Sequence, residues 1–493
     1  MGQTIEITKY NSKYFTTVIV TGLIITLLLC IAMLFFAKDN LMAGVIILLL
    51  PVPLIYMYLI FKFPKVSFIS VLFCNYFAIG LSRYIPAPVG LSVDVTLFLT
   101  LIAILFSQFN HKVEWKLAGK DLTYIAFIWF GMTVMQLINP QTISREAWFY
   151  AMRSQSLYIL LIVPLVYLIF NKPKDLDTFI SICAWFTLFA VFKGLMQKYM
   201  GLDRWEQQWL NLPGNLSTHM LFGKLRVFSF FSDAGTYGGT MGYFGVLYII
   251  LAIHDKRKRK KMFYYFVGIM SLYAMLISGT RSAIAVPLIG FVLYTMLTKK
   301  FKIMIFVGSL VFSIFFILKF TSIGQGNYDI RRMRSAFDGD NASLNVRNGN
   351  RNIFANYLQS RPFGGGIGSS GNWGLRFTPN TLLAQTPTDG WYIQLWAEQG
   401  IVGLTVYLLM IFYFVIKSTF LIFYRIKKPE NLHKAIAFTS GMYGLIVSSY
   451  TASSLGQMPN TIIVFTSMVL ISLMTKWERN EVQENSKVNN IDI

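Results

Sequence analysis

Two arginines stand where this sequence predicts turns at the ends of apolar segments. Arg226 precedes Ser232-Asp233, a pair that favours a helix N-cap, and the glycines that follow permit close helix packing. Arg281 lies in the stretch 278–282, which we interpret as a very tight turn. A charged side chain near a hydrophobic layer is costly unless it is paired or serves a substrate. We therefore assign both arginines as candidate catalytic residues, with contact to lipid headgroups as the alternative for Arg226.

A second pair of arginines, Arg347 and Arg351, lies in the long polar segment 321–400. Within it, residues 345–360 carry apolar side chains at helical spacing and predict a helix. Residues four apart share one face of a helix, so the two guanidinium groups would point the same way. Each group can bind an oxyanion through two hydrogen bonds, which suits a phosphate or a diphosphate. The alternative is an ordinary solvated basic face.

Two acids in the same polar segment are candidates for proton transfer and substrate binding. Asp389 and Glu398 fall in residues 388–400, which predict a second helix with tryptophan and tyrosine side chains at the membrane surface. A carboxylate near the arginines could accept the proton of a substrate hydroxyl. We assign Asp389 a candidate catalytic role and Glu398 a candidate substrate-binding role. A structural salt bridge to an arginine is the alternative for each.

The remainder of the chain consists mostly of apolar segments that must position these residues. Of its 493 residues 55% are hydrophobic and 13% are charged, whereas soluble proteins have roughly 25% charged residues. Apolar runs of roughly 18 or more residues predict an all-α polytopic membrane protein, because a barrel would show shorter alternating segments. About fourteen transmembrane helices are expected, near residues 14–37, 41–61, 66–82, 91–109, 121–138, 155–170, 177–199, 234–253, 262–278, 282–298, 303–320, 401–424, 435–450 and 461–475.

The same segments define the organisation along the chain. We expect N-terminal transmembrane helices over 1–200, central helices with outside loops over 201–320, a large partly helical loop over 321–400, C-terminal helices over 401–476 and a disordered cytoplasmic tail over 477–493. The first apolar run is too long for a signal peptide and lacks a small-residue cleavage site, so we interpret it as a retained helix.

The distribution of lysine and arginine predicts the orientation. The formal net charge is +22, and basic residues accumulate in short cytoplasmic loops, of which 256–261 is the strongest example. Placing that run inside puts both termini in the cytoplasm and the loops 200–233, 278–281 and 321–400 outside. All candidate residues then face the outer side, where an anionic partner would explain so many arginines. The position of the basic run between two apolar segments argues against a nucleic acid.

A glycine run, the histidines and the cysteines carry weaker signals. No strand is expected before Gly364–Gly366, so this run is not a dinucleotide fingerprint. We interpret it as a flexible loop that lets backbone approach a ligand, with a plain linker as the alternative. Only His219 of the four histidines falls outside, and the three cysteines lie in apolar runs without zinc spacing. We therefore expect no metal and no cofactor.

Taken in order, these features resemble the O-antigen ligase and polymerase superfamily of bacterial inner membranes. The shared features are an arginine before a glycine-rich segment, Ser-Gly-Thr-Arg-Ser-Ala at 278–283, Arg-xxx-Arg at 347–351, Pro-x-Gly-Gly-Gly-x-Gly at 362–368 and Glu-Gln-Gly-Ile-Val-Gly at 398–403. The resemblance extends over roughly residues 220–420.

The resemblance implies a metal-independent glycosyltransferase that faces the periplasm. Its donor would be a glycan on undecaprenyl diphosphate, and its partners an acceptor glycan or lipid, the membrane and other polysaccharide-assembly proteins. In the family, arginines that correspond to Arg226 and Arg281 contact the diphosphate or the glycan, and the large loop helps to form the catalytic cavity. The chemistry is consistent with the residues, since arginines can stabilise the charge that develops on a departing diphosphate.

Three functions follow from the resemblance and the composition. Ligases of the family typically carry His-Asn where this chain has Thr388-Asp389. This departure favours a polymerase, which extends a lipid-linked repeat unit, with Asp389 in place of the usual base. The first alternative is a ligase that moves finished glycan onto lipid A core or another acceptor. The second is a flippase or other transporter, although transporters place charges near the bilayer midplane and often have paired halves.

Overall fold

The structure, a computed structural model, describes residues 51–110, 113–212, 214–221, 223–299, 301–337 and 342–489, together with a few residues between 22 and 33. The apolar segment expected at 14–37 and part of the one at 41–61 lie outside the described residues. The chain divides into two compact units, a small one of residues 1–67 and 102–112 and a large one of residues 68–101 and 113–493.

The small unit contains one complete helix, α3 (Pro51–Lys62), and parts of two others. The helices α4 (Pro64–Leu81) and α5 (Ser92–Asn110) begin or end in it and continue in the large unit. Within the small unit the rings of Phe61 and Phe106 meet edge to face at 5.3 Å between centroids.

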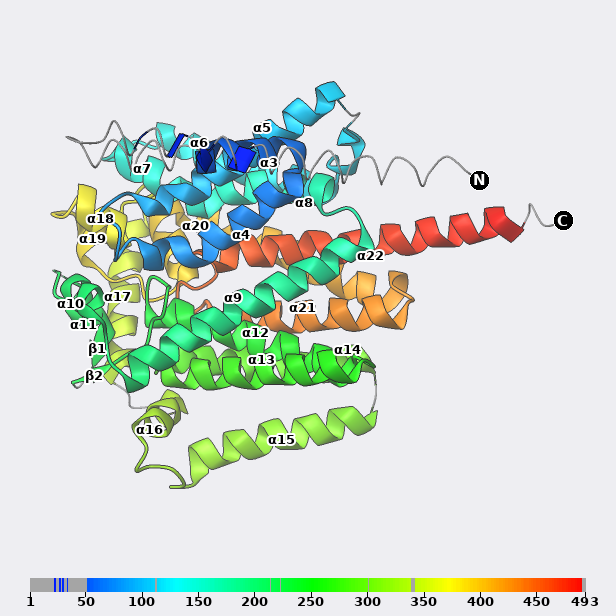
Figure 1. Ribbon diagram of the computed structural model, residues 1–493. Coiled ribbons are helices and arrows are strands. Elements are labelled where there is room, and N and C mark those ends of the chain that lie inside the picture. The colour runs from blue at the N-terminus through cyan, green and yellow to red at the C-terminus, as the bar shows by residue number, and fades with distance from the viewer. Residues whose placement is uncertain are drawn as a thin grey trace. The chain divides into compact units, whose positions relative to one another are not determined.

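The described part of the large unit is almost entirely helical (Figure 1). Its first half contains η1 (Val89–Leu91), η2 (Trp115–Leu117), α6 (Asp121–Met135), η3 (Gln136–Ile138), α7 (Arg145–Met152), η4 (Arg153–Leu157), α8 (Tyr158–Ile169), α9 (Pro173–Tyr199), α10 (Arg204–Leu210), α11 (Asn215–His219), β1 (Met220–Leu221) and β2 (Lys224–Leu225). The two short strands pair antiparallel, with Met220 opposite Leu225.

The second half contains longer helices and the polar segment between them. It comprises α12 (Ala234–His254), α13 (Lys258–Ile277), η5 (Arg281–Ile284), α14 (Ala285–Thr298), α15 (Phe301–Phe320), α16 (Tyr328–Arg334), η6 (Ser335–Phe337), α17 (Ala342–Leu358), α18 (Gly371–Phe377), α19 (Leu382–Gln385), α20 (Trp391–Phe420), η7 (Leu421–Arg425), α21 (Pro429–Ser448) and α22 (Asn460–Asn489).

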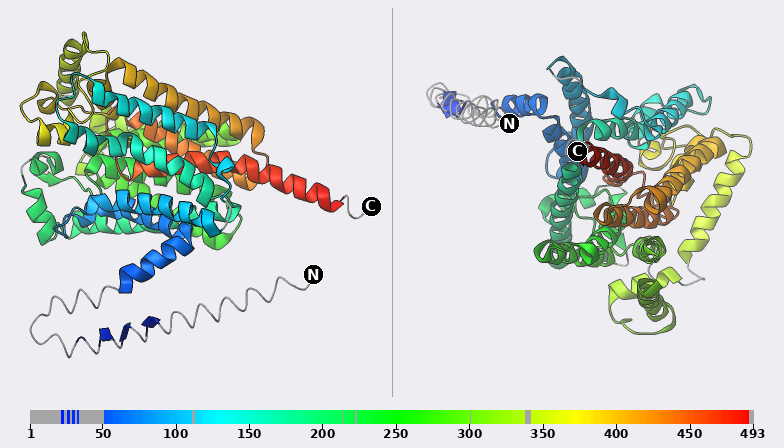
Figure 2. Two further views of the ribbon diagram at one scale, coloured as in Figure 1. Left: turned by 90° about the horizontal axis from the view of Figure 1, so that it is seen from above. Right: turned by 90° about the vertical axis from the view of Figure 1, so that its right-hand side faces the viewer.

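Within the described residues, nine helical segments are long and apolar enough to cross a membrane. They are 64–81, 89–109, 121–138, 145–169, 173–199, 234–254, 281–298, 391–425 and 460–484. These findings confirm the predicted all-α polytopic membrane protein. The helical segment at 145–169 begins earlier than the apolar run predicted, because a helix can continue past the hydrophobic layer. The helix α20 is interrupted at Gly400, which agrees with the predicted helix over 388–400 followed by a span from 401. The helix α22 continues to Asn489 and projects beyond its neighbours (Figure 2), over most of the tail expected to be disordered.

The helix α12 forms the centre of the large unit, and 89% of its most apolar stretch is buried. Its N-cap is Asp233, whose side chain accepts a hydrogen bond from the Thr236 N–H, as the sequence predicts. A Cβ at Gly238 would lie 2.5 Å from the Ser278 side chain, and one at Gly242 would lie 3.0 Å from Val286. The glycines therefore let α13 and α14 pack directly on the backbone of α12.

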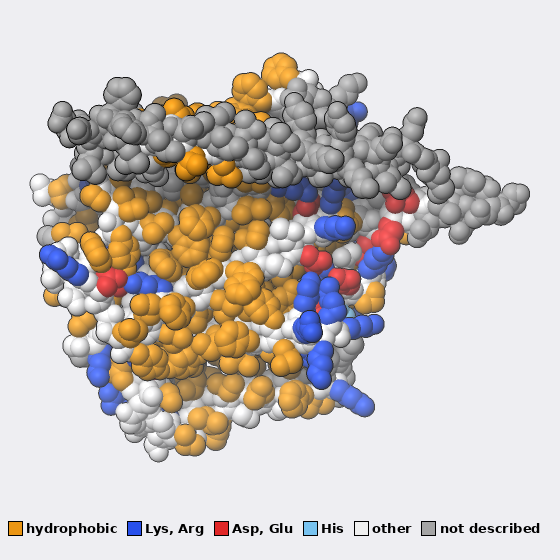
Figure 3. Space-filling view, viewed as in Figure 1, with side chains coloured by type: hydrophobic (Ala, Val, Ile, Leu, Met, Phe, Trp, Pro, Cys, Tyr) orange, Lys and Arg blue, Asp and Glu red, His pale blue; other side chains and the backbone are white. Residues whose placement is uncertain are grey.

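The loops of the large unit lie at two opposite ends (Figure 1). One end carries α10, α11, β1, β2 and α16–α19, and we name it the arginine end (Figure 1). The opposite end carries the connections at residues 255–257 and 426–428, and we name it the basic end. Apolar side chains cover the middle of the face shown in Figure 3, and most of the visible lysine and arginine side chains lie toward its two ends. This arrangement is typical of a membrane-spanning bundle.

Candidate functional site

Neutral groups of the arginine end hold Arg226. Its backbone N–H donates to the His219 carbonyl oxygen at 2.8 Å, directly after the hairpin β1–β2. Its Nη1 donates to the Thr218 carbonyl at 3.1 Å, and its Nη2 donates to the Thr280 hydroxyl at 3.1 Å. Its Nε is buried without a partner. The guanidinium thus has one unused donor.

The turn at residues 278–281 brings Arg281 to the same place. The turn is tight and buried, with Gly279 at φ 62° between α13 and η5. Arg281 donates from Nη1 to the Ser335 carbonyl at 3.5 Å, and Arg332 of α16 donates from Nε to the Gly279 carbonyl at 2.6 Å. The sequence therefore predicted the turn correctly, while Arg332 is an additional residue of the site that sequence reasoning did not single out.

Four arginines are close enough to influence one another. Burial lowers the pKa of Arg226, and the positive charges of Arg281 and Arg347 lower it further, while Asp233 opposes them. Burial also lowers the pKa of Arg332, and the charge of Arg226 adds to this effect. We name Arg226, Arg281, Arg332 and Arg347 the arginine cluster.

Three members of the arginine cluster have no carboxylate partner among the described residues. Within the described chain, Arg226, Arg332 and Arg347 form no ion pair with a carboxylate. Asp233, which acts on Arg226 only through space, accepts hydrogen bonds from the Thr236 N–H at 2.9 Å and from two hydroxyl groups. These three guanidinium groups therefore suit an anion with several oxygen atoms.

The helix α17 confirms the helix predicted over 345–360 and carries Arg347 and Arg351 four residues apart. The two side chains have different neighbours. Arg347 acts on Arg226, whereas the Arg351 guanidinium lies over the ring of Tyr450, 4.7 Å from its centroid. Arg351 thus adjoins the arginine cluster through α17 but is held by a cation–π contact.

Asp389 lies beside α17, in the loop that precedes α20. Its Oδ2 accepts a hydrogen bond from Asn350 Nδ2 at 3.3 Å, and its backbone has the unusual φ of 21°. A Cβ at the adjacent Gly390 would lie 2.4 Å from the Tyr450 carbonyl oxygen, so the backbone of this loop packs closely against the segment after α21. Among the described side chains no cation forms an ion pair with Asp389. The Asp389 carboxylate is half-buried next to the helix that carries Arg347, and no described cation forms an ion pair with it.

Glu398, in contrast, lies in the interior and is fully buried. Its Oε2 accepts a hydrogen bond from Gln155 Nε2 at 2.6 Å, and its Oε1 accepts one from the Ser370 hydroxyl at 2.7 Å. Gln155 belongs to η4, a π-helical turn between α7 and α8. The structure brings Glu398 together with amide and hydroxyl groups rather than with the arginines, so it ties α20 to two other segments.

The glycine run packs against α20. The N–H groups of Gly365 and Gly366 donate to the carbonyl oxygens of Ala397 and Glu398, both at 2.9 Å. A Cβ at Gly364 would lie 2.4 Å from the Gly400 nitrogen, and Gly400 interrupts the helix with φ 64°. The expectation of a flexible ligand-binding loop is therefore wrong: these glycines let two backbones touch.

Among the residues that the structure describes, His219 and the acids of the arginine end are not arranged as a metal site. Both ring nitrogens of His219 face backbone carbonyl oxygens, Asn215 O at 2.9 Å and Ser232 O at 3.2 Å. In the part of the chain that the structure describes, no group of three or more histidine, cysteine, aspartate or glutamate side chains is arranged to hold a metal ion.

Fold and site together define a polytopic α-helical membrane protein that gathers several arginines at one end. A family model described as O-Antigen ligase matches residues 266–408, and this match confirms the resemblance to the O-antigen ligase superfamily. The matched region runs from α13 into α20 and includes Arg281, Arg332, Arg347 and Asp389, whereas Arg226 precedes it. A comparison with curated proteins found no match.

Proposed function

We propose that this protein is a glycosyltransferase of the bacterial inner membrane that polymerises glycan units carried on undecaprenyl diphosphate. The arginine end would face the periplasm, and both termini would lie in the cytoplasm. The single observation that carries the proposal is the arginine cluster. Within it, the Arg226 guanidinium donates only to neutral oxygen atoms, and its buried Nε has no partner. A membrane-borne diphosphate would give Arg226, Arg332 and Arg347 a negatively charged partner.

In the proposed reaction the acceptor hydroxyl oxygen forms a bond to the anomeric carbon of the donor sugar. The bond between that carbon and the diphosphate oxygen breaks, and the diphosphate keeps the electron pair. Arg226 and Arg281 stabilise the negative charge that develops on the diphosphate, with Arg332 and Arg347 beside them. Asp389 takes the proton of the acceptor hydroxyl. Arg351 contacts the diphosphate or the glycan from the same helix as Arg347.

Two observations bear on the choice among the alternatives. The half-buried Asp389, with no ion-pair partner among the described side chains, replaces the histidine of the ligases and supports the polymerase over the ligase. The location of the cluster at one end of the helices supports an enzyme over a transporter, since transporter sites lie near the bilayer midplane. An enzyme that acts on a lipid-linked glycan at the membrane surface does not need a binding site at the bilayer midplane.

Deleting the gene and separating the surface glycan on a gel tests the proposal. Loss of a polymerase leaves single repeat units attached to the acceptor, whereas loss of a ligase leaves none. Unchanged glycan on the deletion strain would contradict both enzymes. Loss of all lipid-linked donor at the periplasmic face would instead favour the transporter.

A further inference from the structure

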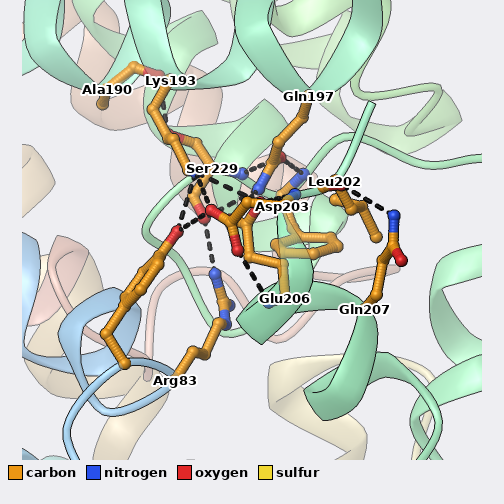
Figure 4. Close-up of polar contacts among 11 residues, drawn as sticks. Arg83, Ala190, Lys193, Gln197, Leu202, Asp203, Glu206, Gln207 and Ser229 are labelled. Carbon is orange, nitrogen blue, oxygen red and sulfur yellow. Dashed lines mark hydrogen bonds and ion pairs between the residues drawn. The ribbon is translucent and has the colours of Figure 1, made fainter. Parts of the chain in front are cut away.

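One arginine that does not belong to the arginine cluster, Arg83, is also buried at the arginine end. Arg83 follows α4, and its side chain is almost completely buried. Figure 4 shows it with Lys193 and Gln197 of α9 and with Asp203 and Glu206 at the start of α10. These five side chains, which we name the Arg83 network, come from three parts of the chain, and two of them, Arg83 and Gln197, contact Ser229.

Arg83 binds the backbone of the segment between Arg226 and α12. Its Nη1 donates to the Ser229 carbonyl at 2.6 Å, and its Nη2 donates to the Phe231 carbonyl. The guanidinium carbon lies 4.4 Å from the ring centroids of both Trp209 and Phe228, which also contact each other at 5.3 Å. A planar group with several donors is needed to make these four contacts at once, and lysine cannot reproduce them.

Gln197 binds the same segment from the other side. Its carbonyl oxygen accepts hydrogen bonds from the Ser229 N–H at 2.7 Å and the Phe228 N–H at 3.2 Å. Its Nε2 donates to Glu206 at 2.7 Å. Ser229 has the left-handed φ of 51°, and its hydroxyl donates to the Ala190 carbonyl at 2.6 Å. Side chains therefore hold this irregular turn, because no helix or strand does.

Charge pairing maintains the Arg83 network in the interior. Glu206 is fully buried and lies 3.1 Å from the Lys193 ammonium, which also contacts Asp203 at 2.9 Å. Burial lowers the pKa of Arg83 to about 10, against the opposing effect of Glu206 and Asp203, so the guanidinium stays charged at neutral pH. Buried charges rarely stabilise more than an apolar core of the same size would. A specific geometric role explains them better.

The segment that the network holds leads directly from Arg226 to the N-cap of α12. Val227, Phe228 and Ser229 are fully buried, and Asp233 begins the helix. We propose that Arg83 and Gln197 are positioning residues, which fix the turn at Ser229 so that the Arg226 guanidinium meets the diphosphate of the substrate. This inference rests on the proposed function, and it extends the site to residues outside the matched region 266–408.

Binding of inorganic pyrophosphate to the purified full-length protein in detergent tests the inference. Wild type should bind, and Arg226→Ala should bind at least tenfold more weakly. Arg83→Lys keeps the charge but loses the fork of donors, and Gln197→Asn shortens the other contact. Each should weaken binding by roughly tenfold, since a misplacement of about 1 Å can cost up to 10²-fold. Lys434→Gln is the matched control, because it removes a buried, doubly paired cation at the basic end.

The double variant Arg83→Lys/Arg226→Ala separates positioning from general stability. If Arg83 acts through Arg226, the double variant should bind no more weakly than Arg226→Ala alone. Additive losses, or an affinity unchanged by both Arg83→Lys and Gln197→Asn while Arg226→Ala weakens binding, would overturn the inference and leave the proposed function intact. Wild-type protein that does not bind pyrophosphate, or binds it independently of Arg226, would contradict the proposed function itself.

Discussion

The two ends of the large unit are both rich in cations, yet their cations have different partners. At the basic end Lys434 forms ion pairs with Asp177 and Glu430, both at 2.8 Å, and Arg257 pairs with Asp255 at 3.0 Å. At the arginine end Arg226 donates only to a carbonyl and a hydroxyl group. Internal carboxylates thus neutralise these two cations of the basic end. At the arginine end they neutralise Lys193 and Lys198, but within the described residues they do not pair with Arg226.

Available space does not explain the difference. The basic end has a cavity of about 480 Å³, lined by His254, His433 and the ion-paired side chains Asp255, Arg257, Glu430 and Lys434. The two imidazole rings stack at 3.6 Å between centroids. Net charge and cavity volume therefore do not identify a site for an anion. What distinguishes the arginine end is that its guanidinium groups lie together and are bound mainly by neutral acceptors.

The largest expected effect is the loss of either central arginine. Arg226→Ala or Arg281→Ala should lower glycan transfer by about 10²–10³-fold, the usual effect of removing a group that stabilises developing negative charge. Arg257→Ala at the basic end is the control and should leave transfer unchanged. Surface glycan on a gel, with immunoblots for protein level, measures both. Wild-type glycan in an Arg281→Ala strain with normal protein level would end the catalytic assignment.

Loss of the proposed base should lower glycan transfer about as much as loss of an arginine, but it should leave pyrophosphate binding intact. Asp389→Asn should lower the turnover rate by about 10²-fold or more, since a general base contributes about 10²–10⁴-fold. Pyrophosphate binding should not weaken, because Asp389 carries no positive charge. Asp255→Asn removes an acid that is paired at the basic end and serves as the control. Equal turnover in both variants would exclude Asp389 as the base.

The two arginines of α17 should differ in their contributions. Arg347→Ala removes a member of the arginine cluster and should weaken pyrophosphate binding by about tenfold. Arg351→Ala should weaken it less, because its guanidinium is already engaged over Tyr450. Titration of each purified variant compares them. A larger effect at Arg351 would move the centre of the site toward Tyr450.

Glu398 tests whether a buried acid of the arginine end binds substrate or maintains the fold. Glu398→Leu leaves the donors of Gln155 and Ser370 unpaired, which costs about 1–3 kcal/mol for a buried group. We expect a lower melting temperature in detergent and an unchanged pyrophosphate affinity of the folded fraction. If the affinity falls while the melting temperature does not, Glu398 contacts the substrate.

The smallest expected effect is a loss of stability at mildly acidic pH. Burial lowers the pKa of His219 below its ordinary value of 6.5, against the opposing effect of its carbonyl partners and Asp233. The unfolded chain then binds the proton more tightly, so this contribution to stability is complete above about pH 6.5 and is lost as the pH falls. Melting temperatures between pH 7.5 and 5 measure it, and His219→Gln should flatten the dependence.

The apolar runs and the basic loops were enough to predict the class of the protein. A long apolar run without backbone partners in lipid must form a helix, which is a local requirement. The tight turn before Arg281 and the shared face of Arg347 and Arg351 are local in the same sense, because they depend on spacing along a few residues. The order of these motifs was enough for the family resemblance.

Contacts between distant residues decided the rest. Glu398 meets Gln155 across 243 positions, so the sequence could not show whether this carboxylate faces arginine or amide groups. Gly364 meets Gly400, and Arg83 meets Ser229 across 146 positions. Sequence by itself determined which arginines lie at one end of the helices. Only the tertiary structure decided which of them keep neutral partners, because pairing depends on which segments pack together.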